Sequence, residues 1–117
     1  MNPAGRARAA LKRGLYASHG VLAMYSTASV NVMVRVRPGK FRCVVRPEET
    51  FRPKAEYHDW MMLVESLQFE PKEGHRVRIL STGQTFELTS PSADEQAARH
   101  TDTSQTEWRL HSVRLHD

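Results

Sequence analysis

The sequence has only one cysteine, Cys43, among its 117 residues. A single thiol excludes an intrachain disulfide and the zinc sites built from four cysteines, so packing and strand pairing must stabilise the fold. No apolar run approaches the roughly 20 residues that span a bilayer, and the basic N-terminus lacks the unbroken apolar core of a signal peptide. We therefore expect a soluble intracellular protein with no membrane contact.

Sequence motifs for nucleotide binding, metal binding and catalysis are also missing. The six glycines form neither a phosphate-binding loop nor a dinucleotide-binding fingerprint. The six histidines lack the paired spacing of a zinc protease, and His111 and His116 are expected on opposite faces of a regular strand. Cys43 lies in an apolar stretch, which is typical of a small buried residue rather than of a nucleophile. The sequence therefore predicts no enzyme activity, no cofactor and no metal site.

What is present is a chain of ordinary globular composition. Hydrophobic residues make up 39% and charged residues 26%, as in folded proteins, and the length suits a single domain over residues 1–117. The net charge of +4 is uneven, because residues 1–50 hold nine Lys and Arg against two acids, whereas residues 51–117 hold eight against eleven. The basic first half favours an acidic partner, either nucleic acid or an acidic protein surface.

Residues 1–20 predict a basic amphipathic helix from Pro3 to about His19, ended by Gly20. Its weak apolar face contains Ala9, Ala10, Leu15 and Tyr16. Alternating apolar residues then predict strands at 21–25 and, most clearly, at 30–36. The short link between them makes the pair an antiparallel hairpin, and Pro38-Gly39 is expected to end its second strand.

The middle of the chain gives weaker signals. Prolines and charges surround residues 38–58, which predicts a long loop that can hold a short edge strand. For Tyr57 to Phe69 a strand and a short helix compete, and we favour the strand because the hairpin that follows needs a partner.

Two turns containing Gly74 and Gly83 predict strands at 76–80 and 85–89. Four side chains are expected on their buried face: Val77, Ile79, Phe86 and Leu88. The polar segment 90–106 has no apolar periodicity, which predicts a second long loop. From Trp108 the alternation resumes and slips once near His111-Ser112, which indicates a final strand with a bulge.

Residues 21–117 therefore predict a mainly β fold. We expect a small antiparallel β-barrel of about six strands, with an N-terminal α-helix and two long loops at 38–58 and 90–106. A barrel with basic strands and a stacking aromatic such as Phe41 is one way to bind single-stranded nucleic acid. The alternative, which we slightly favour, is a solvated face whose arginines keep an edge strand from self-association.

The order of elements and the segments Pro71 to Ile79 and Gly83 to Leu88, followed by a closing strand after a variable loop, resemble the head-tail joining proteins, or stoppers, of long-tailed bacteriophages. The resemblance implies a structural subunit of the connector, or neck, in the virion, made in the host cytoplasm. It implies a homo-oligomeric ring of six or twelve copies that meets the portal or adaptor protein, and the tail terminator or tail tube protein.

The resemblance also implies that the ring helps to retain the packaged DNA that passes through its channel. Function then lies in interfaces, and the long loops are the candidate contacts. The candidate interface or channel residues are Arg37, Lys40, Arg42, Arg46, Arg52 and Lys54. A basic β-barrel that binds nucleic acid, or another neck protein such as a tail terminator, stays open as the alternative.

Overall fold

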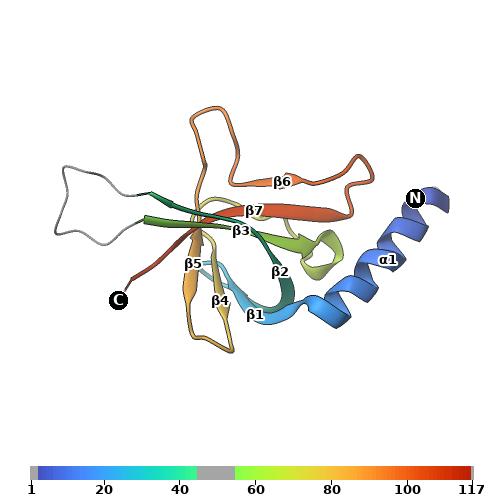
Figure 1. The fold of residues 1–117 in the computed structure, drawn as a ribbon, viewed down its shortest axis with the longest axis horizontal. Coiled ribbons are helices and arrows are strands. Elements are labelled where there is room, and N and C mark those ends of the chain that lie inside the picture. Colours follow the sequence, from blue (N-terminus) through green and yellow to red (C-terminus); the bar gives the residue numbers. More distant parts are fainter. Residues whose placement is uncertain (1–2, 45–54, 117) are drawn as a thin grey trace.

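The computed structural model describes residues 3–44 and 55–116, without the side chains of residues 3–9, 12 and 42–44. A helix precedes a series of antiparallel strands (Figure 1). The elements are α1 (Pro3–His19), β1 (Val21–Ser26), β2 (Asn31–Val44), β3 (Ala55–Leu63), a 3-10 turn η1 (Val64–Ser66), β4 (Arg76–Ile79), β5 (Thr85–Leu88), β6 (Ala98–His100) and β7 (Glu107–Arg114). Within the described residues, no helix is long and apolar enough to cross a membrane.

Six of the strands close into a barrel. The order β3-β2-β1-β4-β5-β7 is completed by the pairing of β3 with β7, and all of these pairs are antiparallel. On its other edge β7 pairs with β6 near its start and with β5 near its end. The predicted mainly β barrel of about six strands with an N-terminal helix is therefore confirmed, with β6 as an additional strand.

The barrel interior follows from the period of two along each strand. Alternate side chains point inward, and the fully buried ones include the aromatic residues Tyr25 and Phe86. The predicted buried face on β4 and β5 is confirmed, since its four members are at most 4% exposed: Val77, Ile79, Phe86 and Leu88. Burying each such side chain stabilises the fold by roughly 1.5–3 kcal/mol relative to exposure.

The first hairpin is confirmed, but Pro38-Gly39 does not end its second strand. β2 runs on to Val44, and its register with β3 shifts between Pro38 and Phe41, as in a β-bulge. A Cβ atom on Gly39 would lie 3.1 Å from both the Cβ atom and the carbonyl oxygen of Asp59, so the bulge favours a glycine. In the predicted loop 38–58, residues 38–44 and 55–58 are strands, which is more than the short edge strand expected there; residues 45–54 lie outside the description.

The strand expected at Tyr57 to Phe69 is present as β3, but it is shorter and is followed by η1. Its partners are β2 and β7 rather than the hairpin formed by β4 and β5. The competing helix signal therefore marks only one short turn at the end of the strand.

The second predicted loop, 90–106, was wrong for residues 98–100, which form β6. Three residues are too few to show alternation, so no period signals this strand. Ala97 and Ala98 are buried, and the His111 N–H donates to the Ala97 carbonyl over 2.7 Å. The ring of His100 stacks on Trp108 at 4.0 Å between centroids, which fixes the strand against β7.

The bulge predicted in the last strand was also wrong. The register between β3 and β7 is continuous from Tyr57 opposite Val113 to Leu63 opposite Glu107. The inward position is occupied by Ser112, which is 1% exposed and donates its hydroxyl to the His58 carbonyl over 2.7 Å. The apparent slip in the apolar pattern is a polar residue in a core position.

His75 links the turn before β4 to the barrel core. Its Nδ1 accepts hydrogen bonds from the Lys72 N–H at 3.2 Å and from the Tyr25 hydroxyl at 2.5 Å. Because a protonated Nδ1 cannot accept either bond, the folded state needs the neutral ring. Burial, with a smaller effect of the Lys72 charge, lowers the pKa of His75.

We therefore expect the free energy of unfolding to decrease between pH 7 and pH 5. The unfolded chain binds a proton near the ordinary histidine pKa of about 6.5, whereas the folded protein binds it only at lower pH. This contribution of His75 is complete above the unfolded pKa and is lost as the pH falls toward the folded one. Urea unfolding at both pH values should show a smaller decrease for His75→Gln than for the natural sequence.

The exposed residue Gln68 provides the control, since Gln68→Ala removes no group that titrates between pH 5 and pH 7 and should leave the pH dependence unchanged. Part of the decrease should remain in His75→Gln, because burial also lowers the pKa of His58. An equal decrease in His75→Gln and the natural sequence would contradict the assignment of a neutral His75.

Candidate functional site

The described residues do not assemble a metal-binding cluster of three or more histidine, cysteine, aspartate or glutamate side chains. The closest approach to a catalytic pair is His111 Nδ1, 2.8 Å from Asp59 Oδ1, with Arg109 at 3.7 Å from the other carboxylate oxygen. The adjacent Ser112 donates its hydroxyl proton to a backbone carbonyl, so His111 does not activate it. Asp59, Arg109 and His111 form a polar group on the outer side of the barrel.

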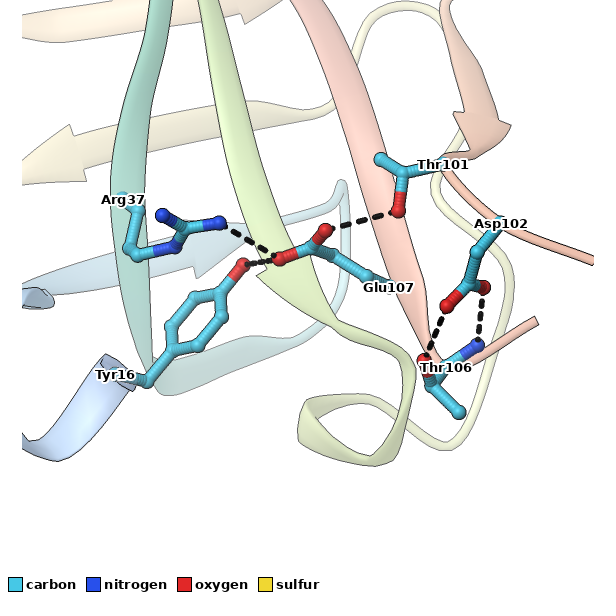
Figure 2. A network of polar contacts seen from close by, with 6 residues as sticks. All are labelled: Tyr16, Arg37, Thr101, Asp102, Thr106 and Glu107. Atoms are coloured by element: carbon cyan, nitrogen blue, oxygen red, sulfur yellow. Dashed lines mark hydrogen bonds and ion pairs between the residues drawn. The ribbon is translucent and has the colours of Figure 1, made fainter. Parts of the chain in front are cut away.

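A buried carboxylate joins the helix to the barrel (Figure 2). Glu107, at the start of β7, is 3% exposed. Its Oε2 accepts hydrogen bonds from the Tyr16 hydroxyl of α1 at 2.8 Å and from Arg37 of β2 at 3.2 Å. Its Oε1 accepts one from the Thr101 hydroxyl at 2.8 Å. One side chain of β7 thus holds the helix, a second strand and the β6–β7 connection together.

The surroundings of Tyr16 keep its hydroxyl group protonated. The Arg37 guanidinium lies 5.3 Å above the centre of the Tyr16 ring, in a cation–π arrangement. Burial, together with the hydrogen bond to the Glu107 carboxylate, raises the pKa of Tyr16 above its ordinary value. Tyr16 therefore remains a neutral hydrogen-bond donor at physiological pH.

The turn that precedes Glu107 is shaped by a second carboxylate. Asp102 accepts the Thr106 hydroxyl at 2.9 Å and the Thr106 N–H at 3.2 Å (Figure 2). Gln105 between them has a positive φ of 55°. These bonds hold the turn in a shape that places Glu107 beneath the helix.

Apolar packing also holds α1 against the barrel. Tyr16 is buried together with Met61 and Leu63 of β3. Outside this contact Arg13 forms two hydrogen bonds of 2.7 and 2.8 Å to the Glu65 carboxylate on η1. Of the predicted apolar helix face, Tyr16 is buried but Ala10 and Leu15 are exposed, and the side chain of Ala9 lies outside the description.

Of the six predicted interface residues, the structure describes the side chains of two, Arg37 and Lys40. Arg37 is half-buried and engaged by Glu107, whereas Lys40 is exposed next to the bulge. Arg42 is paired through its backbone with Tyr57, and its side chain lies outside the description. Arg46, Arg52 and Lys54 also lie outside the described residues.

A pocket of 480 Å³ lies on the outer side of the barrel, where β2, β3, β6 and β7 meet. It brings Lys40 together with Arg99 and Arg109, and it also contains the acids Asp59 and Glu95. Arg99 and Arg109 are direct cross-strand partners, an arrangement that places like charges side by side. Sequence reasoning missed both arginines, because only the pairing of β6 with β7 brings them together.

Comparison with known proteins assigns the chain to a family. No curated protein matches the sequence. The model of a family described as phage head-tail joining proteins matches residues 1–117, the whole chain, which confirms the resemblance seen in the sequence. Such a protein is a structural component of the virion at the junction of head and tail, where it interacts with other head and tail proteins. The chain therefore belongs to the phage head-tail joining proteins.

Proposed function

We propose that this protein is a stopper of the phage neck: a ring of identical subunits, made in the host cytoplasm, that joins the portal or adaptor to the tail and helps retain the packaged DNA. Six or twelve copies would suit the symmetry of such a ring. Its partners are the portal or adaptor on the head side and the tail terminator or tail tube protein on the other. We infer no enzymatic activity, because the role of the family is structural.

The observation that carries this proposal is the projecting end of β2 and β3. Beyond Val36, β2 has no contact in register with β1 and pairs only with β3. This extension, residues 40–44 of β2 and 55–58 of β3, is called the β2–β3 arm, and at its base Tyr57 and His58 also pair with β7. The β2–β3 arm lies at the opposite end of the molecule from α1 (Figure 1). A subunit with extensions at both ends can contact two different neighbours.

The β2–β3 arm is also basic. Lys40 and Arg42 lie on its β2 strand, and Arg46, Arg52 and Lys54 lie in the adjoining segment of the sequence. We propose that these five side chains face the DNA in the channel, where phosphate contacts are independent of base sequence. Arg37 has a different role in this proposal, since it fixes the base of the arm through Glu107.

The test uses the phage that encodes the protein. Lys40→Glu combined with Arg42→Glu should leave the subunit in the particle but reduce the nuclease-protected DNA of heads several-fold, because two phosphate contacts per subunit become repulsive. Lys72→Glu, which changes an exposed cation on the turn before β4, is the control for charge. Protected DNA and incorporated protein are both measured in purified particles.

If particles with the double variant protect their DNA fully, the β2–β3 arm does not face the channel.

The rival function is a nucleic-acid-binding barrel. Fluorescence anisotropy of labelled DNA, measured with the purified protein, distinguishes the two functions. Tight binding at physiological salt, falling steeply as salt rises, would favour the rival and replace the stopper as the primary function. A stopper subunit should bind DNA weakly as a monomer.

A further inference from the structure

The outer side of β2, β1 and β4 combines exposed apolar and cationic side chains. The strand register places Met24 between Met33 and Arg78, and Leu22 beside Arg35. Leu22, Met33 and Leu80 are 44%, 51% and 43% exposed. This surface is called the arginine face and consists of Leu22, Met24, Met33, Arg35, Arg78 and Leu80. Such a concentration of exposed apolar side chains marks an interaction site.

A groove extends the arginine face toward the helix. It has a volume of 360 Å³ and runs between Tyr16 and Ala17 of α1 and the side chains of Leu22, Met33 and Arg35. Because α1 is fixed by Glu107, one wall of this groove is held in place rather than free to collapse onto the strands. The groove therefore offers a preformed apolar surface with a cation at its edge.

No carboxylate of its own strands balances this face. Residues 1–47 contain no aspartate or glutamate, and β4 consists of Arg-Val-Arg-Ile. Among the described residues, neither Arg35 nor Arg78 has an ion-pair partner, whereas Arg13 and Arg37 are paired within the chain. The unpaired arginines indicate that the surface that covers this face is acidic.

The same chain carries an acidic surface on its other side. The loop between β5 and β6, residues 89–97, contains Asp94 and Glu95 and no lysine or arginine, and Glu95 also lines the pocket that contains Lys40, Arg99 and Arg109. Residues 92–96 of this loop are all exposed. The acidic loop stands at the top of Figure 1, whereas β1 and β4 lie toward the bottom. One copy therefore cannot cover its own arginine face with this loop.

Hydrogen bonds hold the acidic loop in a defined shape. The Thr89 N–H donates to the His111 carbonyl at 2.9 Å, and the Ser90 hydroxyl lies 3.4 Å from a Glu73 carboxylate oxygen. Within the loop the Glu95 N–H donates to the Ser92 carbonyl at 3.3 Å. A loop ordered before docking costs less conformational entropy when it binds.

We propose that the acidic loop of one copy docks on the arginine face of the next copy, so that Asp94 and Glu95 meet Arg35 and Arg78. This inference rests on the proposed ring and names its subunit contact. A contact between two different patches on opposite sides of a subunit is heterologous, and it closes into a ring when the rotation between copies allows. The exposed Leu22 and Met33 would be covered in the same step.

The test is a charge swap in assembled particles. Arg35→Glu with Arg78→Glu, and separately Asp94→Lys with Glu95→Lys, should each lower the yield of tail-joined particles at least about tenfold, because like charges then face each other. The two swaps combined in one chain should restore the yield to within about threefold of the natural protein, because the opposite charges are paired again. Joined particles are counted in electron micrographs and as plaques.

Matched controls use the turn before β4, whose exposed charges lie outside both surfaces: Lys72→Glu and Glu70→Lys should each leave the yield unchanged. All substituted residues are exposed, and urea unfolding of each variant checks that the barrel is intact. If a charge reversal disturbs the barrel, the neutral set Arg35→Gln, Arg78→Gln, Asp94→Asn and Glu95→Gln replaces it, and each neutral pair should still lower the yield.

Three results would overturn the proposal. Neither swap lowering the yield would show that the two surfaces are not in contact. If each swap lowers the yield but the combined variant does not restore it, different partners cover the arginine face and the acidic loop. The same conclusion follows if only the arginine swap lowers the yield. A different experiment tests the proposed function. If a phage that lacks the protein still produces tail-joined heads that retain their DNA, the proposed function is wrong.

Discussion

Replacing Phe86 with alanine is expected to lower the free energy of unfolding by about 3–5 kcal/mol. Phe86 on β5 is fully buried, and its ring meets Trp60 at 5.2 Å and His58 at 4.7 Å between centroids. The substitution removes the ring and leaves a cavity that neighbouring strands of a closed barrel cannot easily fill. Since small domains are stable by only about 5–15 kcal/mol in total, this single change should leave a measurable unfolded population.

Urea unfolding followed by tryptophan fluorescence measures this loss, because Trp60 reports directly on the Phe86 site. The control is Leu11→Ala, at an apolar side chain that is 72% exposed and is expected to change stability by no more than about 0.5 kcal/mol. A loss below about 1 kcal/mol for Phe86→Ala would contradict a packed aromatic centre in the barrel.

Replacing Glu107 with alanine should lower the free energy of unfolding by about 3 kcal/mol and release the helix from the barrel. The change leaves the Tyr16 hydroxyl, the Arg37 guanidinium and the Thr101 hydroxyl without their common acceptor. The estimate is at the lower end of the range for a broken buried pair, because the Arg37 side chain is 29% exposed and water partly compensates its charge.

Two measurements separate the loss of stability from the release of the helix. Urea unfolding gives the first, and hydrogen exchange of the α1 amides in the folded protein gives the second. Tyr16→Phe removes one hydrogen bond and should cost only about 1 kcal/mol. Glu65→Gln, which weakens the exposed contact to Arg13, should leave the helix protected. Unchanged exchange in Glu107→Ala would mean that apolar packing alone holds α1.

Much of the barrel could be predicted because its strands show a regular period and well-defined turns. Val77 and Ile79 alternate with arginines, and the turns on either side contain glycines at φ 91° and 73°, a region that favours glycine. The predicted helix 3–19 matches α1 for the same local reason: a run of helix-forming residues ends at Gly20. Local patterns are sufficient where local geometry decides the structure.

The errors arose where distant residues decide the structure. A proline such as Pro38 usually predicts the end of a strand. At this point β2 has only one neighbouring strand, so the position without an N–H can face the free edge of the sheet. Ser112 reads as a break in the core pattern, but a backbone carbonyl 54 residues away satisfies its hydroxyl. Neither partner is visible in a local window of sequence.

The candidate surfaces were the least predictable part. The charge asymmetry indicated that the first half of the chain needs an acidic partner. A count of charges cannot distinguish Arg35 from Arg37. Only the structure distinguishes them, since Arg37 is engaged by a glutamate 70 residues later in the chain, whereas Arg35 points outward beside Leu22. Contacts made in the fold decide which charged side chains remain available for a partner.

The position of β7 has a consequence for biosynthesis. β7 pairs with β3, β5 and β6, and Glu107 at its start binds Tyr16 across a sequence separation of 91 residues. While the chain is being translated, the earlier strands therefore have unpaired edges and the helix has no acceptor, a state that is prone to aggregation. Closure through such long-range contacts is slow and waits for the last strand. A prematurely terminated chain cannot form the barrel, so only chains translated through β7 present the surfaces needed to enter a virion.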